Sequence, residues 1–349
     1  MKTTASSVTR SASLAGQWNL GKSLHTSAKH FVTRVPLVKA AGLMLLNLVW
    51  RVRLSTGRIE SELGSAHATR TLEQSLDYIE EVFADYKRYG HIERFAGRVA
   101  EIGPGDNAGV ALLMRAAGCD QIDLIDRFLS RYDAQQQARI CDSLARRYDL
   151  DSLRMGASWD CRSLSGITWR NGESSEKYFS ECARQNPQTY DLIVSRAVLE
   201  HLQDPLACIR NMVECLKPGG RMLHKIDLRD HGMFSPVHDE LAWLEIPSVM
   251  WKLMTSQSGH PNRVLAHGYR EVLEDLKRAG LIDYSLLITS LVGAGDVAPH
   301  RPFEDVERTA KSRALAFVKT KRKRLAREFR CVASEDLATS GVFLIAERL

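Results

Sequence analysis

The sequence predicts an α/β fold built on a seven-stranded, mostly parallel sheet with helices on both faces. Short apolar runs of strand length alternate with longer segments of helical spacing from residue 98 onward, and this alternation is typical of a parallel sheet. The length of 349 residues, with 44% hydrophobic and 26% charged residues, suits a globular protein with a substantial core.

The first strand–helix–strand unit occupies residues 98–126. In chain order it comprises a buried strand, a glycine turn, a helix, a second strand and an acid: Val99–Ile102, Gly103-Pro104-Gly105, 107–117, Ile122–Ile125 and Asp126. Glycines allow a ligand to approach the backbone closely. Asp126, at the carboxyl end of its strand, is placed to accept hydrogen bonds from both hydroxyls of a ribose. The unit therefore predicts a nucleoside site.

The remaining elements follow in order. They are a helix over 129–148, a third strand within 151–189, a fourth strand over Asp191–Ser195, a helix from Pro205, a fifth strand over Arg221–Leu228, a helix over 269–279, a sixth strand over Asp283–Leu291 and a final antiparallel strand over Gly341–Ala346. Asp204 is a favoured N-cap, and Pro205 is favoured at the first helical position. We expect a helical lid over 232–265, after the fifth strand, and a helical insertion over about 295–332.

The glycine pattern alone does not choose the ligand, because Gly103, Gly105 and Ala108 also fit a dinucleotide fingerprint. Glu101, two residues before the first glycine, helps to decide which ligand is bound. A carboxylate suits the ammonium group of an amino acid and is unfavourable beside a pyrophosphate. A nucleoside joined to an amino acid is S-adenosylmethionine.

Three later segments strengthen this interpretation: Asp191-Leu-Ile-Val-Ser195, Val198-Leu-Glu-His-Leu202 and Leu216-Lys-Pro-Gly-Gly220. With the glycine turn, residues 92–230 resemble the class I S-adenosylmethionine-dependent methyltransferases. The resemblance implies a Rossmann-like fold and a cofactor site that includes Glu101, Gly103, Gly105, Asp126, Arg127 and Ser195. It also implies an acid beside the adenine, for which we expect Glu173 or Glu176. No metal site is predicted.

Titratable residues gather at the end of the fifth strand, where the ligand crevice of such a sheet lies. A hydroxyl acceptor needs a general base, and His is the usual one. Among His201, His224, His231 and His260 we favour His231, because Asp227 and Asp230 are close enough in sequence to orient its ring. These three residues are the predicted catalytic group.

The predicted reaction is methylation of a hydroxyl on a small molecule: a sugar, a surface glycan or a secondary metabolite. The segment from Asp227 to Arg263 resembles a subset of methyltransferases that act on such compounds. Two alternatives stay open: a non-catalytic S-adenosylmethionine-binding or scaffold protein, and a nicotinamide-dependent oxidoreductase. A nucleic-acid methyltransferase ranks below these, because the sequence shows no appended RNA-binding module and its net charge is only +6.

The N-terminal part is expected to comprise a disordered tail over 1–30 and a helical extension over 31–90, ahead of the catalytic domain over 91–349. The apolar segment 35–53 either packs on the core or on a second subunit, as in a homodimer, or lies in a membrane interface. The basic segment 319–330 is a second candidate for membrane contact. Seven scattered cysteines predict free thiols in a reducing compartment. We therefore expect a cytoplasmic protein, with peripheral attachment to the inner membrane face as the variant.

Overall fold

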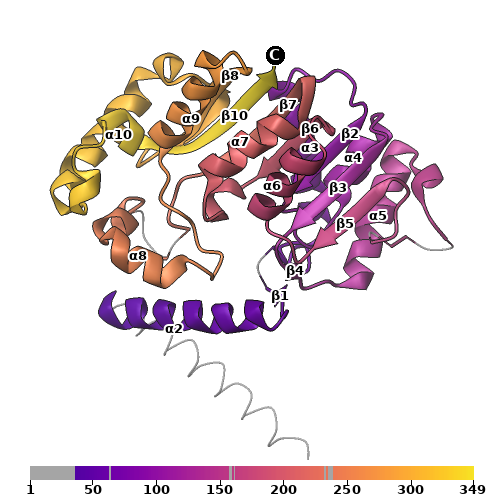
Figure 1. Ribbon diagram of the computed structural model, residues 1–349, viewed down its shortest axis with the longest axis horizontal. Helices are drawn as coiled ribbons and strands as arrows, with labels where there is room; N and C mark the ends of the chain where they lie inside the picture. The colour runs from indigo at the N-terminus through magenta and orange to yellow at the C-terminus, as the bar shows by residue number, and fades with distance from the viewer. Residues whose placement is uncertain (1–35, 63, 157–158, 161, 232, 235–238) are drawn as a thin grey trace, which may run out of the picture.

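The computed structural model describes residues 36–349 except 63, 157–158, 161, 232 and 235–238 (Figure 1). The tail expected over 1–30 lies outside the described residues.

The central sheet has eight strands in the order β5-β3-β2-β6-β7-β10-β8-β9. Their bounds are β2 Arg98–Ile102, β3 Gln121–Asp126, β5 Ile167–Asn171, β6 Tyr190–Arg196, β7 Leu216–Asp227, β8 Ile282–Leu291, β9 Gly295–Arg301 and β10 Thr339–Arg348. The first five strands in this order are parallel, and β10 is inserted antiparallel between β7 and β8. The mostly parallel α/β sheet is confirmed.

The expectation of seven strands is wrong by one, since β9 pairs antiparallel with β8 at the edge of the sheet. Its residues were expected to begin a helical insertion. Pro299 explains part of the difference, because proline is unfavourable inside a helix and is tolerated in an edge strand. A 3-10 turn over Phe303–Asp305 follows β9, and the first α-helix of the insertion is α10 over Arg308–Lys321.

Helices cover both faces of the sheet. One group packs together over one face: α3 Leu72–Tyr89, α4 Gly109–Ala116 and α5 Ala134–Tyr148. The other group comprises α6 Ser175–Gln185, α7 Pro205–Cys215, α9 Ala266–Arg278 and α11 Ser334–Ala338. Alternation along β2 serves both layers: Val99 belongs to the first core, and Ala100 and Ile102 belong to the second. The expected N-cap Asp204 accepts from the Ala207 N–H at 3.0 Å.

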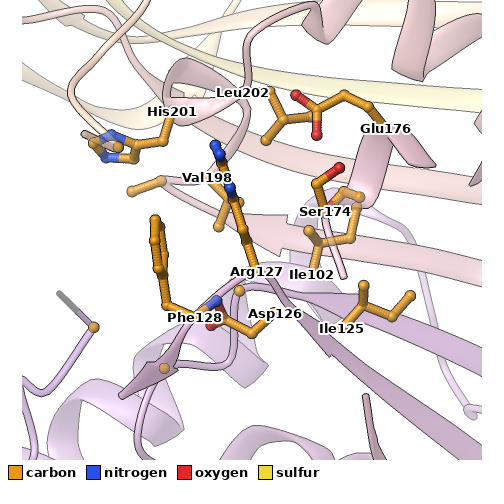
Figure 2. A pocket seen from close by; sticks show the side chains of 16 residues that line it. Ile102, Ile125, Asp126, Arg127, Phe128, Ser174, Glu176, Val198, His201 and Leu202 are labelled. Carbon is orange, nitrogen blue, oxygen red and sulfur yellow. The ribbon is translucent and has the colours of Figure 1, made fainter. Parts of the chain in front are cut away.

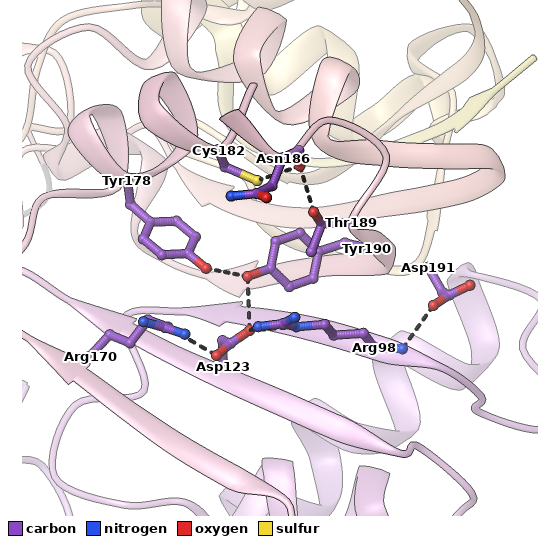
Figure 3. A network of polar contacts seen from close by, with 9 residues as sticks. All are labelled: Arg98, Asp123, Arg170, Tyr178, Cys182, Asn186, Thr189, Tyr190 and Asp191. Carbon is purple, nitrogen blue, oxygen red and sulfur yellow. Dashed lines mark hydrogen bonds and ion pairs between the residues drawn. The ribbon is translucent and has the colours of Figure 1, made fainter. Parts of the chain in front are cut away.

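A buried carboxylate ties four strands together below the ligand-binding edge (Figure 3). Asp123 of β3 accepts from Arg98 of β2, from Arg170 of β5 and from the hydroxyl of Tyr190 of β6, each at 2.9 Å. Asp123 is 3% exposed, so these three hydrogen bonds to its carboxylate replace the hydrogen bonds that it would otherwise make with water. The network links β2, β3, β5 and β6 side by side through one carboxylate.

Helix α2 (Pro36–Ser55) lies along the outside of the molecule, below the rest of the chain in Figure 1. It packs against α8 (Ser248–Thr255), in the segment where a lid was expected. A short two-stranded sheet, β1 (Glu60–Ser61) with β4 (Leu129–Ser130), joins the chain after α2 to the segment after β3. Among the described residues, no helix is long and apolar enough to cross a membrane.

The cysteines differ in one respect from expectation. Five described cysteines are free thiols: Cys119, Cys182, Cys208, Cys215 and Cys331. Cys141, however, is disulfide-bonded, so the expectation that all seven would be free is wrong.

Candidate active site

A cavity opens at the carboxyl ends of β2, β3 and β6 (Figure 2). Its walls come from the end of β2 and the turn after it, the end of β3 and the residues after it, the start of α6 and the loop after β6, and Gly64 and Gly259 complete them. Strand ends of a parallel sheet are the usual ligand-binding edge of this architecture. The cavity therefore lies where the sequence predicted a nucleoside site.

Two glycines of the turn have conformations and surroundings that admit no side chain. Gly103 has φ +66° and Gly105 has φ +69°, both in the left-handed region that favours glycine. A Cβ on Gly103 would lie 2.5 Å from Val198 Cγ2, and one on Gly105 would lie 2.5 Å from the carbonyl oxygen of Gly64. Both glycines line the cavity, so the turn brings bare backbone to it.

Asp126 and Arg127 also line the cavity, as the sequence predicted. The Oδ1 atom of Asp126 accepts from the Phe128 N–H at 2.9 Å. Burial raises the pKa of Asp126 to about 6, although this backbone bond opposes the shift. Arg127 extends into the cavity in Figure 2, and its Nη2 donates to Gln257 Oε1 at 3.0 Å.

Of the two acids expected beside an adenine, the structure brings Glu176 to the cavity and leaves Glu173 out. Glu173 lines a neighbouring cavity and lies 3.5 Å from Lys177 Nζ. The reason is the helix start: Ser174 is the N-cap of α6, so Glu173 precedes the helix and Glu176 belongs to its first turn. Glu176 Oε1 accepts from the Gln203 N–H at 2.7 Å.

Glu101 is buried behind the turn and is not part of the cavity wall. Its Oε2 has no hydrogen-bond partner among the described residues, and burial raises the pKa of Glu101 to about 8. Arg70 lies in the same region, with its guanidinium 4.4 Å from the ring centre of Tyr78, whose pKa responds to both Arg70 and Glu101. The buried Nη1 of Arg70 likewise has no partner among the described residues. Arg70 was not among the site residues predicted from the sequence; it lies one residue before Thr71, where the capping box of α3 begins, and this is the local signal that could have pointed to it.

Ser195, which was expected to contact the cofactor, is not among the residues that line the cavity. It is completely buried, and its Oγ lies 2.8 Å from Nδ1 of His224. The two residues are register partners on β6 and β7, which places both side chains inside the sheet's packing layer. Burial lowers the pKa of His224 to about 3.

The predicted catalytic group at the end of β7 is close together but sits beside the cavity. His231 Nε2 lies 3.6 Å from Asp227 Oδ2, while Asp227 also accepts from Arg229 Nε and Nη2 at 2.8 and 2.7 Å. Burial alone would raise the pKa of Asp227, but the bonds and charge of Arg229 lower it. The charge of Asp230 opposes the lowering of the His231 pKa by burial, and its Oδ2 accepts from the Phe234 N–H at 3.0 Å.

His201 lines the cavity, although His231 is the histidine that the sequence analysis favoured. Its ring meets that of His231 edge-on, with centroids 5.1 Å apart. Burial lowers the pKa of His201 to about 4. Glu200, His201 and His231 each offer a ligand atom, and these atoms lie within 4.8 Å of one another. The group could accommodate a metal ion, although the sequence predicted none.

Comparison with known proteins agrees with this geometry. A family model described as a methyltransferase domain matches residues 75–281. The ubiquinone biosynthesis O-methyltransferase of Aliivibrio fischeri is 45% identical over 40 residues, which is 12% of this chain and only 17% of that protein.

Two solved structures are similar at low identity. Phosphoethanolamine N-methyltransferase 2 of Haemonchus contortus is 15% identical with a TM-score of 0.38, over 77% of this chain and 52% of that one. The N-methyltransferase NodS of Bradyrhizobium japonicum is 14% identical with a TM-score of 0.35, over 80% and 98%. These two likenesses are too distant to bear on function. The family match extends over more than half of the chain, which therefore belongs to the class I S-adenosylmethionine-dependent methyltransferases.

Proposed function

We propose that this methyltransferase methylates a hydroxyl group of a small molecule. The observation that carries the proposal is a histidine pair beside the cavity formed by the glycine turn: His201 lines that cavity, and the ring of His231 meets the ring of His201 edge-on, with centroids 5.1 Å apart. An alkyl hydroxyl is a very weak acid, so its methylation benefits from a base, whereas an amine acceptor needs less help.

The residues around the cavity fit the nucleoside half of S-adenosylmethionine. Gly103 and Gly105 have no side chain, and a Cβ on either would collide with Val198 or Gly64. The turn can therefore lie against the cavity only with glycine at these two positions. Asp126 is a half-buried carboxylate that accepts from the backbone N–H groups of Phe128 and Gly105, and ribose hydroxyls would supply further donors to it. Glu176 at the first turn of α6 is the acid we assign to the adenine side.

The methionine half would be held on the other side of the turn. Its ammonium group suits Oε2 of Glu101 and its carboxylate suits Nη1 of Arg70, two buried atoms that have no hydrogen-bond partner within the described part of the chain. Burial disfavours the ionised form of Glu101 in the free chain, and an ammonium group bound beside it would favour that form; a zwitterionic ligand that also pairs with Nη1 of Arg70 is therefore favoured. We add Arg70 to the predicted cofactor site and leave out Ser195 and Glu173.

Within the histidine pair we assign the base to His231. The pKa of His201 near 4 makes it a poor proton acceptor. Burial also lowers the pKa of His231, but Asp227 at 3.6 Å opposes that shift and would stabilise the imidazolium. His201 would then position the acceptor. Asp227 acts as a positioning residue for the ring of His231.

When bound, the cofactor supplies an electrophilic methyl group on its sulfonium sulfur. The chain's own residues would hold the acceptor oxygen in line with that group, and His231 would take the hydroxyl proton as the O–C bond forms and the S–C bond to the departing thioether breaks. Alignment of this kind accounts for a large part of the barrier reduction in such displacements. Sugar, surface-glycan and secondary-metabolite hydroxyls are the acceptors we propose.

The test is a methyl-transfer screen with S-adenosylmethionine carrying a labelled methyl group. The purified full chain is incubated with sugar nucleotides, lipid-linked sugars and phenols, and with matched amines. Label on an oxygen, lost in His231→Ala, supports the proposal. Label only on nitrogen, or transfer that is unaffected by both His231→Ala and His201→Ala, would overturn it.

A further inference from the structure

The outward face of α2 is apolar, which is unusual for the outermost helix of a soluble domain. We define this outer face by its exposed apolar residues: Leu45, Leu46, Leu48, Val49 and Val52, which are 64%, 40%, 55%, 46% and 56% exposed. A surface helix normally turns its polar residues outward. Exposed apolar side chains clustered on one helix mark a contact surface.

The polar residue of this stretch points the other way. Asn47 is buried and bonds to three groups of the α8 segment: its Nδ2 donates to Leu253 O at 3.0 Å and to Ser256 Oγ at 3.1 Å, and its Oδ1 accepts from Gln257 N–H at 2.6 Å. These bonds fix the rotation of α2 about its axis. The apolar face is therefore held outward by specific contacts.

The neighbouring helix adds to the surface. Val249 and Leu253 of α8 are 76% and 57% exposed, among the most exposed apolar residues of the described chain. Lys252, also exposed, lies between them in sequence. Two packed helices thus both present apolar side chains with a basic residue close by.

The distribution of charge along the chain indicates which kind of partner the outer face of α2 would contact. Residues 1–59 contain nine Lys and Arg and no Asp or Glu, while the other 290 residues contain 39 basic against 42 acidic residues. In α2, Arg51 is exposed and Arg53 stacks on Trp50 at 4.5 Å. The positive charge of the whole chain is thus concentrated in and before the helix with the apolar outer face.

This charge argues against a second copy of the chain as the occupant. The Lys39 Nζ lies 5.4 Å from the ring centre of Phe234, and Arg53 donates to the carbonyl oxygen of Glu60, so these two charges of α2 are turned toward the chain. Pairing of two copies would still bring together two stretches, residues 1–59 of each, that carry nine basic and no acidic residues. An anionic surface is the complementary partner.

The other basic segment, 319–330, is less suited to this task. Lys321 pairs with Asp239 at 2.6 Å, and Arg324 pairs with Glu245 at 2.9 Å. Arg322 donates to the carbonyl groups of Arg330 and Val332, each at 2.7 Å. These charges are engaged within the chain, and among its described residues no apolar face of comparable exposure accompanies them.

We propose that the outer face of α2, with Val249 and Leu253 of α8, lies in the interfacial layer of an anionic lipid bilayer. The helix lies parallel to the membrane plane, with its apolar side chains at the boundary of the acyl region and its basic side chains among the headgroups. This arrangement does not require the proposed acceptor to be correct.

The experiment is sedimentation of the full chain with unilamellar vesicles. One set contains phosphatidylcholine alone, and the other contains equal parts of phosphatidylcholine and phosphatidylglycerol. We expect binding to the anionic vesicles that is at least tenfold stronger than to the neutral ones and that weakens as salt is raised.

Leu48→Glu tests the face directly, and Met155→Glu is its matched control. The two residues are 55% and 57% exposed, and Met155 lies on neither helix. Leu48→Glu should reduce the vesicle partition coefficient at least tenfold, while Met155→Glu should leave it unchanged. S-adenosylhomocysteine binding, measured by calorimetry in the same samples, should be equal in all three proteins and verifies folding.

Three results would overturn the proposal: wild-type protein that stays in the supernatant with anionic vesicles, equal binding of Leu48→Glu and wild type, or a dimer that Leu48→Glu dissociates without any vesicle binding. The last would assign the face to a second copy. Failure of the proposed function has a different signature, because it would appear in the methyl-transfer screen while vesicle binding persists.

Discussion

Replacing Gly105 with alanine tests whether the glycine turn is shaped by its contact with Gly64. Two costs arise in Gly105→Ala. The left-handed conformation at φ +69° costs an alanine about 1–2 kcal/mol relative to glycine. The new Cβ would also stand 2.5 Å from the Gly64 carbonyl oxygen, a backbone atom that must move away to restore an ordinary contact.

Gly280→Ala is the matched control, because it shares the first cost and lacks the second. Gly280 has φ +70°, and a Cβ there would meet nothing within 4 Å. We expect both variants to lose about 1–2 kcal/mol of unfolding free energy from the backbone conformation, measured by urea denaturation. Only Gly105→Ala should also lose affinity for S-adenosylhomocysteine, by about tenfold or more, which is about 1.4 kcal/mol.

The comparison can fail in two clear ways. If Gly105→Ala binds S-adenosylhomocysteine as tightly as the wild type, the turn does not need the bare backbone that we assign to it. If Gly280→Ala loses the same affinity, the loss reports general destabilisation and not the cavity. Branched residues at position 105 should be worse than alanine, because they add atoms toward the same carbonyl group.

Four further predictions concern the site. Asp126→Ala should weaken cofactor binding by about 1.5–3 kcal/mol, the loss of charge-assisted hydrogen bonds, and unchanged affinity by calorimetry would place the ribose contact elsewhere. His231→Ala should reduce turnover by about 100-fold with cofactor affinity unchanged; full activity of this variant alongside an inactive His201→Ala would exchange the two roles. Because the folded pKa of Glu101 is raised to about 8 from an ordinary 4.5, the native state holds an extra proton between these values, so stability should fall as pH rises through this window and Glu101→Gln should remove that dependence. Treatment with a chelator should leave activity unchanged if His231 is the base; loss restored by an added divalent ion would reassign its cluster with Glu200 to a metal centre.

Features set by local sequence were predictable. The glycine turn, the strand before it and Asp126 at the end of the next strand depend on residues within one short stretch, and the structure places all of them at the cavity. The N-cap at Asp204 is equally local. Such features follow from conformational preferences that a sequence displays directly.

Features that depend on pairing between distant segments could not be predicted from the sequence. Ser195 faces His224 because of the register between β6 and β7, which the sequence of neither strand reveals. Arg70 reaches the region of Glu101 only because the chain before α3 folds back over the sheet. The edge strand β9 depends on an open edge at β8, and its own residues give no clear strand pattern.

The chain between α2 and α3 has a consequence for where this enzyme can be cut. Gly64 O accepts from the Asp106 N–H at 3.1 Å, and the Asp106 carboxylate accepts from the N–H groups of His67 and Ala68 at 3.3 and 2.8 Å. These hydrogen bonds hold residues 64–68 against the glycine turn, where Gly64 forms part of the cavity wall. The matched family domain begins only at residue 75. A fragment that begins at residue 75 would retain the strands of the central sheet but would lack residues 64–68, which include Gly64 of the cavity wall.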